Sequence, residues 1–371
     1  MKILHLVTGR GPTGPAAAAM SDVKALLAAG HSAYIAVKEN ALMQACASEG
    51  LPCVGGLKLG RGAFRLIHLP HDVRRLREII RELSIDVLHV HRSDDQLLAA
   101  LSLGRSLTAT LVRTWHRDPN GVPRLLLGKL ARQADGCVCV SRQHATALLA
   151  NGAKAAEFLD VAVDTTVFCP SQMEQTSAAA STTMIGQVGR WKRGRDGADR
   201  GQQAALDVFD SLSTKLSWKG ILIGRGEMGA ALRHEAFTER GLSPQRIEIL
   251  DVPKQSPADF ARLLSSLSLG LVFNAGSDGT SRAGAELLSC GVPLLVADLP
   301  GLRELADDNS CALRQLPNDP QGWARTIEQL LTDNERLQQM RVAARQRAEK
   351  THAMNVRGAA LAEFYKAIRM K

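Results

Sequence analysis

The stretch that decides the fold runs from Asp278 to Glu304 and reads DGTSRAGAELLSCGVPLLVADLPGLRE. An apolar segment, 269–273, precedes it, and a Gly/Ser/Thr-rich loop then opens a helix that contains Glu286. The first turn of a helix presents unpaired N–H groups and a positive dipole end, so it can hold phosphate. A carboxylate about two turns into the helix can accept hydrogen bonds from a diol. The stretch therefore predicts a strand, a loop and a helix that form a nucleotide-sugar site.

Strand-like and helix-like segments alternate along the rest of the chain, which predicts an α/β protein with two doubly wound parallel sheets. The polar segment 171–183 has no periodicity and is expected to be a linker. We therefore predict an N-terminal domain over 1–170 and a second domain over 184–352. A last amphipathic helix over 353–371 completes the chain. Open parallel sheets bind ligands at the carboxyl ends of their strands, so a cleft between the two domains is expected to hold the site.

Composition limits the classes of function. The 371 residues contain 46 Lys and Arg against 37 Asp and Glu, a net charge of +9 that favours anionic partners. The seven cysteines form no Cys-x-x-Cys pair, so the sequence predicts no metal site and a reducing, cytoplasmic setting. A signal peptide and a bilayer-spanning segment are not evident. No nucleic-acid partner is expected, because no recognised module accompanies the charge.

A basic stretch over 58–81 allows two interpretations. Seven Lys and Arg residues interleave there with Leu, Ile and Val. Such a pattern can lie on an anionic membrane surface, which would place the protein at the inner face of the cytoplasmic membrane. It is equally typical of a solvated helix whose apolar face joins the core.

The stretch from Asp278 to Glu304 resembles the acid-x7-acid signature of the retaining glycosyltransferases of family 4, which have the GT-B fold. The resemblance implies two facing Rossmann-like domains, with the donor held mainly by the second, and a last helix over 353–371 that packs back on the N-terminal domain. Glu286 would hold the ribose and Asp278, where the family has Glu, would orient the transferred sugar. The resemblance also implies that the loop and helix start lie beside the phosphates, at Gly279, Thr280, Ser281 and Arg282.

Further donor contacts follow from the same resemblance. Arg190 and Arg200 would hold the diphosphate and neutralise it as the leaving group departs. Arg195 has the usual spacing from Arg190 and competes with Arg200 for this role. Gly224 and Val252 end later strands and would line the nucleotide pocket.

In the first domain, Gly14 is the best match for a glycine-rich loop that reaches the phosphates, although Pro15 beside it lacks an N–H. His116 corresponds to the family's active-site histidine beside the donor sugar. His91 and Arg92 also end a strand and are candidates for the acceptor side.

The resemblance therefore implies a metal-independent retaining glycosyltransferase without a cofactor. It would move a hexose-type sugar from a UDP- or GDP-sugar to a hydroxyl of a cell-envelope glycolipid or polysaccharide precursor. Two alternatives stay open: another GT-B enzyme such as a nucleotide-sugar epimerase, and a weakly active nucleotide-sugar binding protein.

Overall fold

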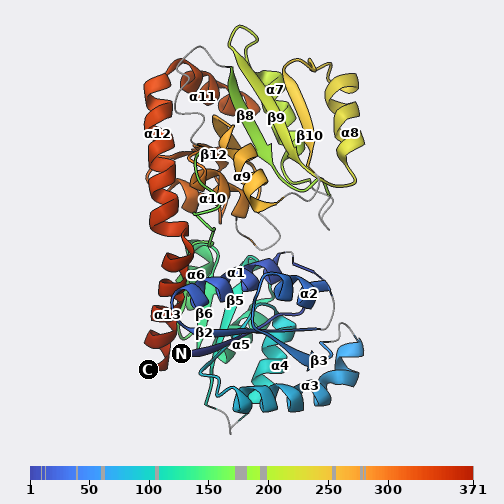
Figure 1. The fold of residues 1–371 in the computed structure, drawn as a ribbon, viewed down its shortest axis with the longest axis vertical. Helices are drawn as coiled ribbons and strands as arrows, with labels where there is room; N and C mark the ends of the chain where they lie inside the picture. The colour runs from blue at the N-terminus through green and yellow to red at the C-terminus, as the bar shows by residue number, and fades with distance from the viewer. Residues whose placement is uncertain are drawn as a thin grey trace. The chain divides into compact units, whose positions relative to one another are not determined.

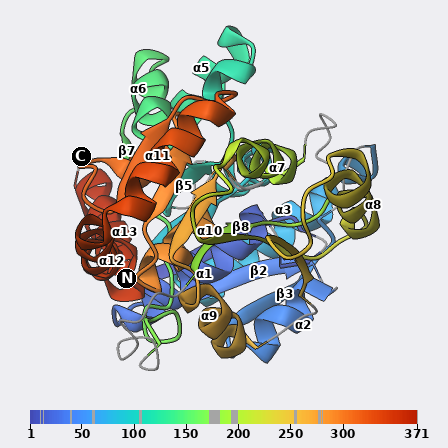
Figure 2. The same ribbon diagram turned by 90° about the horizontal axis from the view of Figure 1, so that it is seen from above.

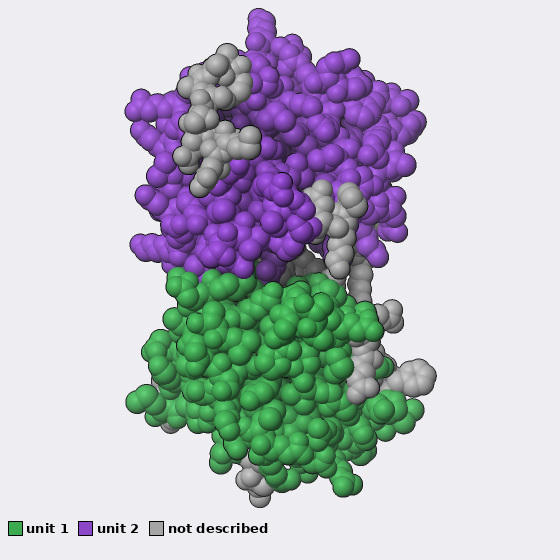
Figure 3. Space-filling model, viewed as in Figure 1, with its two compact units in different colours: residues 1–162, 277–280, 354–371 green, residues 163–276, 281–353 purple. Residues whose placement is uncertain are grey.

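The computed structural model describes residues 1–9, 11–12, 14–38, 41–59, 63–104, 108–171, 182–192, 199–252, 256–275, 279 and 281–370. The chain forms two compact units (Figure 3). Unit 1 comprises Met1–Ala162, Ser277–Thr280 and Met354–Lys371, and unit 2 comprises Val163–Gly276 and Ser281–Ala353. The predicted linker falls largely on 172–181, which lie outside the described residues.

Unit 1 is built on a seven-stranded parallel sheet of order β3-β2-β1-β4-β5-β6-β7. Its strands read as continuous apolar runs because helices cover both faces of a parallel sheet, and Ile3, Leu4 and Leu6 are fully buried. The strands are β1 (Lys2–Leu6), β2 (Ser32–Lys38), β3 (Cys53–Leu57), β4 (Val87–Val90), β5 (Thr110–Trp115), β6 (Gly136–Cys139) and β7 (Ala156–Phe158).

The C-terminal helix of the chain belongs to unit 1 and packs along its first helix (Figures 1 and 2). A Cβ at Gly358 would collide with the carbonyl oxygen of Ala25, so glycine permits this close approach. The helices of the unit are α1 (Pro15–Ala28), α2 (Ala41–Ser48), α3 (Ala63–Glu82), α4 (Ser93–Leu103), α5 (Arg124–Gln133), α6 (Arg142–Ala150) and α13 (Met354–Arg369).

A buried ion pair also joins α13 to α1. The Arg357 guanidinium donates to both carboxylate oxygens of Asp22, at 2.9 and 3.2 Å, and to the carbonyl of Asp160 at 3.1 Å. Asp22→Ala is expected to destabilise the protein by about 3–5 kcal/mol, because Arg357 would stay buried without its counter-charge. Chemical denaturation measures this loss. The double variant Asp22→Leu/Arg357→Met should recover most of it, and a double variant as unstable as Asp22→Ala would contradict this assignment.

Unit 2 contains a six-stranded parallel sheet of order β10-β9-β8-β11-β12-β13. The strands are β8 (Thr183–Val188), β9 (Trp218–Gly224), β10 (Ile247–Asp251), β11 (Leu269–Val272), β12 (Leu294–Ala297) and β13 (Ala312–Gln315). The helices are α7 (Gln202–Ser211), α8 (Gly229–His234), α9 (Pro257–Ser265), α10 (Arg282–Ser289), α11 (Pro320–Thr332) and α12 (Asn334–Arg347). The prediction of an α/β protein with two parallel sheets is therefore confirmed.

Helix α3 differs from its sequence-based prediction. A start at Pro70 is expected because proline favours the first turn, but the helix begins at Ala63 and carries Pro70 inside it. Its apolar positions Leu76, Ile79 and Ile80 are buried in the core of unit 1. These three residues are therefore core residues. Ile67, which is 69% exposed, and the basic residues of 58–81 remain for the predicted membrane contact. No helix in the described part of the chain has the length and apolar character of a bilayer-spanning segment.

Candidate active site

In the unit 2 sheet, the chain passes from β8 to β9 on one side and from β11 to β12 on the other. The strand order therefore reverses between β8 and β11. Parallel sheets bind ligands at such a switch point, outside the carboxyl ends of the two strands. Arg190 follows β8, and Ser281 and Arg282 follow β11 at the start of α10. Arg190, Ser281 and Arg282 therefore flank the switch point of this sheet.

Gln202 connects Arg190 with Arg200 at the start of α7, and Gln187 on β8 also bonds to Arg200. The side chain of the fully buried Gln202 accepts from the backbone N–H of Arg200 at 2.9 Å and donates to the carbonyl of Arg190 at 3.4 Å. Gln187 donates to the carbonyl of Arg200 at 3.0 Å. The backbones of both predicted cations are thus held beside the end of β8, whereas Arg195 lies outside the described residues.

Gly201 lets the chain turn from Arg200 into α7. Its φ is +94°, and a Cβ there would lie 2.8 Å from the Cβ of Phe273, so another residue would be strained and would clash. Asp199 accepts hydrogen bonds from the N–H groups of Gly201 and Gln203, at 3.1 and 2.6 Å. This turn fixes the backbone of Arg200 at the start of α7.

Gly224 ends β9 beneath the fully buried ring of Trp191. A Cβ on Gly224 would collide with the carbonyl oxygen of Gly189 and with the Trp191 indole. The carbonyl of Gly224 accepts from the N–H of Val252 at 2.7 Å, which connects the ends of β9 and β10. The structure therefore places Gly224 and Val252 at the same edge of the sheet as Arg190.

Gly224→Ala is expected to destabilise the protein by about 3 kcal/mol, because the new methyl group meets backbone that cannot move without separating β8 from β9. Thermal or urea unfolding measures this effect. Gly121→Ala is the matched control, since a Cβ at Gly121 meets nothing within 4 Å. Equal stability of the two variants would show that the contact between Gly224 and the Trp191 segment has been misassigned.

Helix α10 carries the predicted ribose ligand Glu286, which is partly exposed. The Ser281 hydroxyl accepts from the N–H of Gly284 at 3.1 Å and caps the helix. Gly279 has a φ of +77° and is counted with unit 1, where a Cβ would collide with the carbonyl oxygen of His116. Asp278 and Thr280, both predicted site residues, lie outside the described residues.

Unit 1 has its own switch point, between β1 and β4. Gly14, with a φ of +56°, precedes α1 at the end of the loop after β1. His91 and Arg92 follow β4, and the Arg92 guanidinium donates to the carbonyl of Thr8 at 3.4 Å. The structure thus brings the predicted residues Gly14, His91 and Arg92 to one edge of this sheet.

Asp95 in α4 also bonds to the loop that follows β1, a contact that the sequence does not predict. Its buried carboxylate accepts from the N–H of Thr8 at 3.2 Å and from the Thr8 hydroxyl. Burial raises the pKa of Asp95 to about 7, although these hydrogen bonds oppose the rise. A buried, titratable carboxyl therefore stands next to the loop between β1 and Gly14.

His116 follows β5 and is buried, with 7% of its surface exposed. Its Nε2 lies 3.1 Å from Nδ1 of His91, and Nε2 of His91 lies 3.0 Å from Nδ1 of His5. The predicted catalytic histidine and one predicted acceptor residue are therefore in contact. His5 cannot be recognised from the sequence, because a single polar residue in the apolar run of β1 carries little signal.

Potential metal ligands also gather here. His5, Asp22, His89 and His91 offer ligand atoms that all lie within 4.8 Å of one another. Asp22 is paired with Arg357, and both nitrogens of His89 have hydroxyl partners, Tyr365 at 2.6 Å and Thr114 at 2.7 Å. A nearby guanidinium and bonded ligand atoms fit a cation poorly, so this cluster is a hydrogen-bonded network rather than a metal centre.

Acid is expected to destabilise this network. Burial lowers the pKa of His5 to about 4 and holds the pKa of His89 and His91 well below 6.5, so the unfolded chain binds more protons below pH 6.5. Asp95 has the opposite sign, so these four groups leave the unfolded chain with an excess of about two protons, to which the lowered pKa values of His31 and His144 add. Stability should therefore fall by roughly 3 kcal/mol per pH unit between pH 6 and pH 5. Urea unfolding measures the slope, and stability that is constant over this range would contradict the buried neutral histidines.

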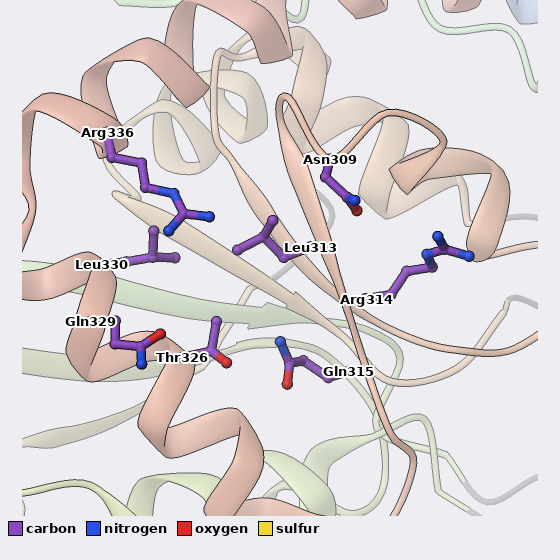
Figure 4. Close-up of a pocket in the computed structure, with 8 residues that line it drawn as sticks. All are labelled: Asn309, Leu313, Arg314, Gln315, Thr326, Gln329, Leu330 and Arg336. Atoms are coloured by element: carbon purple, nitrogen blue, oxygen red, sulfur yellow. The ribbon is translucent and has the colours of Figure 1, made fainter.

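Two hollows lie away from the predicted site residues. One of about 460 Å³ lies at β13, the strand at the edge of the unit 2 sheet (Figure 4). Its lining is Asn309, Leu313, Arg314, Gln315, Thr326, Gln329, Leu330 and Arg336. The other, of about 540 Å³, is in unit 1 between the 119–121 turn, α5 and α6. Neither includes a predicted residue, and β13 is remote from the switch point.

Solved structures share this two-unit architecture and define its class as GT-B. A glycosyltransferase from Rickettsia africae ESF-5 has a TM-score of 0.80 at 15% identity, over 99% of this chain and 98% of that one. Anabaena Alr3699/HepE in complex with UDP has a TM-score of 0.79 at 18% identity, over 99% and 100%. The lipopolysaccharide outer core galactosyltransferase WaaB, in its apo form, has a TM-score of 0.73 at 15% identity, over 99% and 100%.

The family follows from the sequence matches. Residues 19–174 match Glycosyltransferase Family 4, and residues 192–347 match Glycosyl transferases group 1. The chain belongs to this family of group 1 glycosyltransferases, as the signature from Asp278 to Glu304 predicts. None of the curated proteins compared with the chain matches it.

Proposed function

We propose that this glycosyltransferase moves a hexose-type sugar, with retention, from a UDP- or GDP-sugar to a hydroxyl of a cell-envelope glycolipid or polysaccharide precursor. The observation that carries the proposal is the position of Arg190, Arg200 and α10 around the switch point of the unit 2 sheet. HepE has been solved with UDP and WaaB is a lipopolysaccharide galactosyltransferase, which supports the donor and acceptor classes.

The proposal assigns a role to each group of residues. Glu286 holds the ribose diol, and Arg190 and Arg200 neutralise the diphosphate as it leaves. Asp278 and His116 orient the transferred sugar, and His91 and Arg92 serve the acceptor side. Because two guanidinium groups carry the compensating charge, we expect transfer to continue when EDTA is present.

Acceptor-dependent transfer tests the proposal. Radiolabelled UDP- and GDP-hexoses are incubated with the protein and with lipid or polysaccharide precursors extracted from a bacterial envelope. We expect label to enter an extractable product, with release of the nucleoside diphosphate. Donor binding without transfer to any acceptor of the panel would instead favour the weakly active binding protein.

The same reaction run without acceptor distinguishes a transferase from the alternative, an epimerase. A transferase leaves the donor sugar unchanged apart from slow hydrolysis, whereas an epimerase releases an epimerised sugar or nucleotide sugar.

The basic residues of α3, among them Arg74 with an 85% exposed side chain, are the proposed contact with anionic headgroups. Binding to vesicles that contain anionic lipid, lost at high salt, would support this contact.

A further inference from the structure

Four histidine rings form a continuous group inside unit 1. His5 on β1 and His89 on β4 are register partners, and their ring centroids are 4.6 Å apart. His91 lies 4.9 Å from His89 and stacks on His116 at 5.4 Å. All four side chains are buried, so their hydrogen bonds are shielded from water.

Three of these rings form a line of hydrogen bonds that ends at His116. Nδ1 of His5 is 3.0 Å from Nε2 of His91, and Nδ1 of His91 is 3.1 Å from Nε2 of His116. His89 stands beside the line, because its nitrogens bond to the hydroxyls of Tyr365 and Thr114. A change at His5 can therefore reach His116 through His91.

The protons on this line must all point the same way. Burial lowers the pKa of His5 to about 4 and the pKa of His91 well below 6.5, so each ring is neutral at pH 7 and carries one N–H. If His91 donates from Nδ1 to His116, its bare Nε2 must accept from His5. If His91 donates from Nε2 to His5, its bare Nδ1 must accept from His116. The tautomer of His5 thus determines that of His116.

The surroundings of His5 decide whether the hydrogen bonds run from His5 to His116 or from His116 to His5. Nε2 of His5 is buried and has no hydrogen-bond partner among the described residues. An orphaned buried N–H is rarer and less favourable than a bare acceptor nitrogen. His5 therefore carries its proton on Nδ1 and donates to His91, which donates to His116. His116 accepts at Nε2 and holds its own proton on Nδ1.

We propose that His5 and His91 are positioning residues that fix His116 as the Nδ1–H tautomer, so that it meets the donor sugar as a hydrogen-bond donor and not as a base. The role toward a sugar rests on the proposed function. The tautomer is a property of unit 1 and can be measured whether or not the protein transfers sugar.

Long-range ¹H–¹⁵N correlation spectra of protein labelled with ¹⁵N-histidine test the tautomer directly. Loss of signals in His5→Asn, His91→Asn and His116→Gln assigns the three rings among the ten histidines. At pH 7 we expect each of the three to show a protonated Nδ1 and a bare Nε2. A proton on Nε2 of His116, a doubly protonated His116, or stoichiometric metal found on these rings by elemental analysis would overturn the proposal.

Two variants of His5 test the effect on catalysis. His5→Asn keeps an N–H donor near the position of Nδ1, whereas His5→Leu removes it. His5→Leu should lower kcat by about tenfold or more and leave the donor-induced rise in Tm unchanged, and His5→Asn should restore most of the rate. Equal kcat in the two folded variants would overturn the proposal. A wild-type protein that transfers no sugar would contradict the proposed function instead, while the spectra would still decide the tautomer.

Discussion

Replacing Glu286 by alanine is expected to abolish the stabilisation of the protein by its nucleotide-sugar donor. Glu286 is partly exposed on α10, one of the elements that flank the switch point of unit 2. Hydrogen bonds from a diol to a carboxylate are worth about 1.5–3 kcal/mol. Their loss corresponds to a Kd that rises by roughly 10- to 150-fold, which removes the thermal shift at moderate donor concentration.

The control for Glu286→Ala is Glu335→Ala. Glu335 is an exposed carboxylate in the first turn of α12, in the same unit. Its replacement should leave both the Tm of the free protein and the donor-induced shift close to the wild-type values. If Glu286→Ala kept the full shift, the ribose contact would have to come from another residue.

His116→Ala is expected to have the opposite signature, with donor binding retained and transfer reduced by about 10²–10³-fold. A positioned imidazole contributes on this scale when it acts on the reacting region and not on the bound nucleotide. The variant also leaves Nδ1 of His91 without its partner, so its own Tm should fall. The donor-induced shift must therefore be measured against the free variant, and kcat from initial rates of label transfer.

His31→Ala is the matched control for His116→Ala. His31 precedes β2, at the amino edge of the unit 1 sheet, whereas His116 follows β5, at the carboxyl edge of the same sheet. It should change neither kcat nor the donor-induced shift. Loss of donor binding in His116→Ala equal to that in Glu286→Ala would refute the separation of a nucleotide-binding role from a catalytic role.

Much of the fold could be predicted because parallel strands are buried on both faces. Such strands read as short apolar runs, which is why the strands around Ile3 and Leu271 can be found without a structure. The edge strands β3, β7 and β13 cannot be predicted in this way, since each is short and pairs with a neighbour on one side only. The start of α3 was placed too late because Pro70 resembles a helix start, whereas buried residues further along the helix stabilise a longer one.

The candidate site could be predicted only in part. The resemblance to family 4 implies Arg190, Gly224 and Glu286, and the parallel sheet brings Arg190 and Gly224 to one edge because they lie at the ends of their strands. The residues that hold them could not be predicted: Gln202 bridges the two arginines and Trp191 fills the space above Gly224. The contact between Trp191 and Gly224 joins two separate strand-end segments that only the tertiary structure brings together, and the hydrogen bonds of Gln202 depend on the turn that precedes α7.

The central claim is that the switch point of unit 2 binds the diphosphate of a nucleotide sugar. The most direct measurement is the Tm of the wild-type protein with each member of a panel of UDP-, GDP- and ADP-sugars. We predict that at least one UDP- or GDP-sugar raises Tm in a concentration-dependent way, and that Glu286→Ala removes this rise. No stabilisation by any sugar of the panel, at concentrations up to the millimolar range, would contradict the claim.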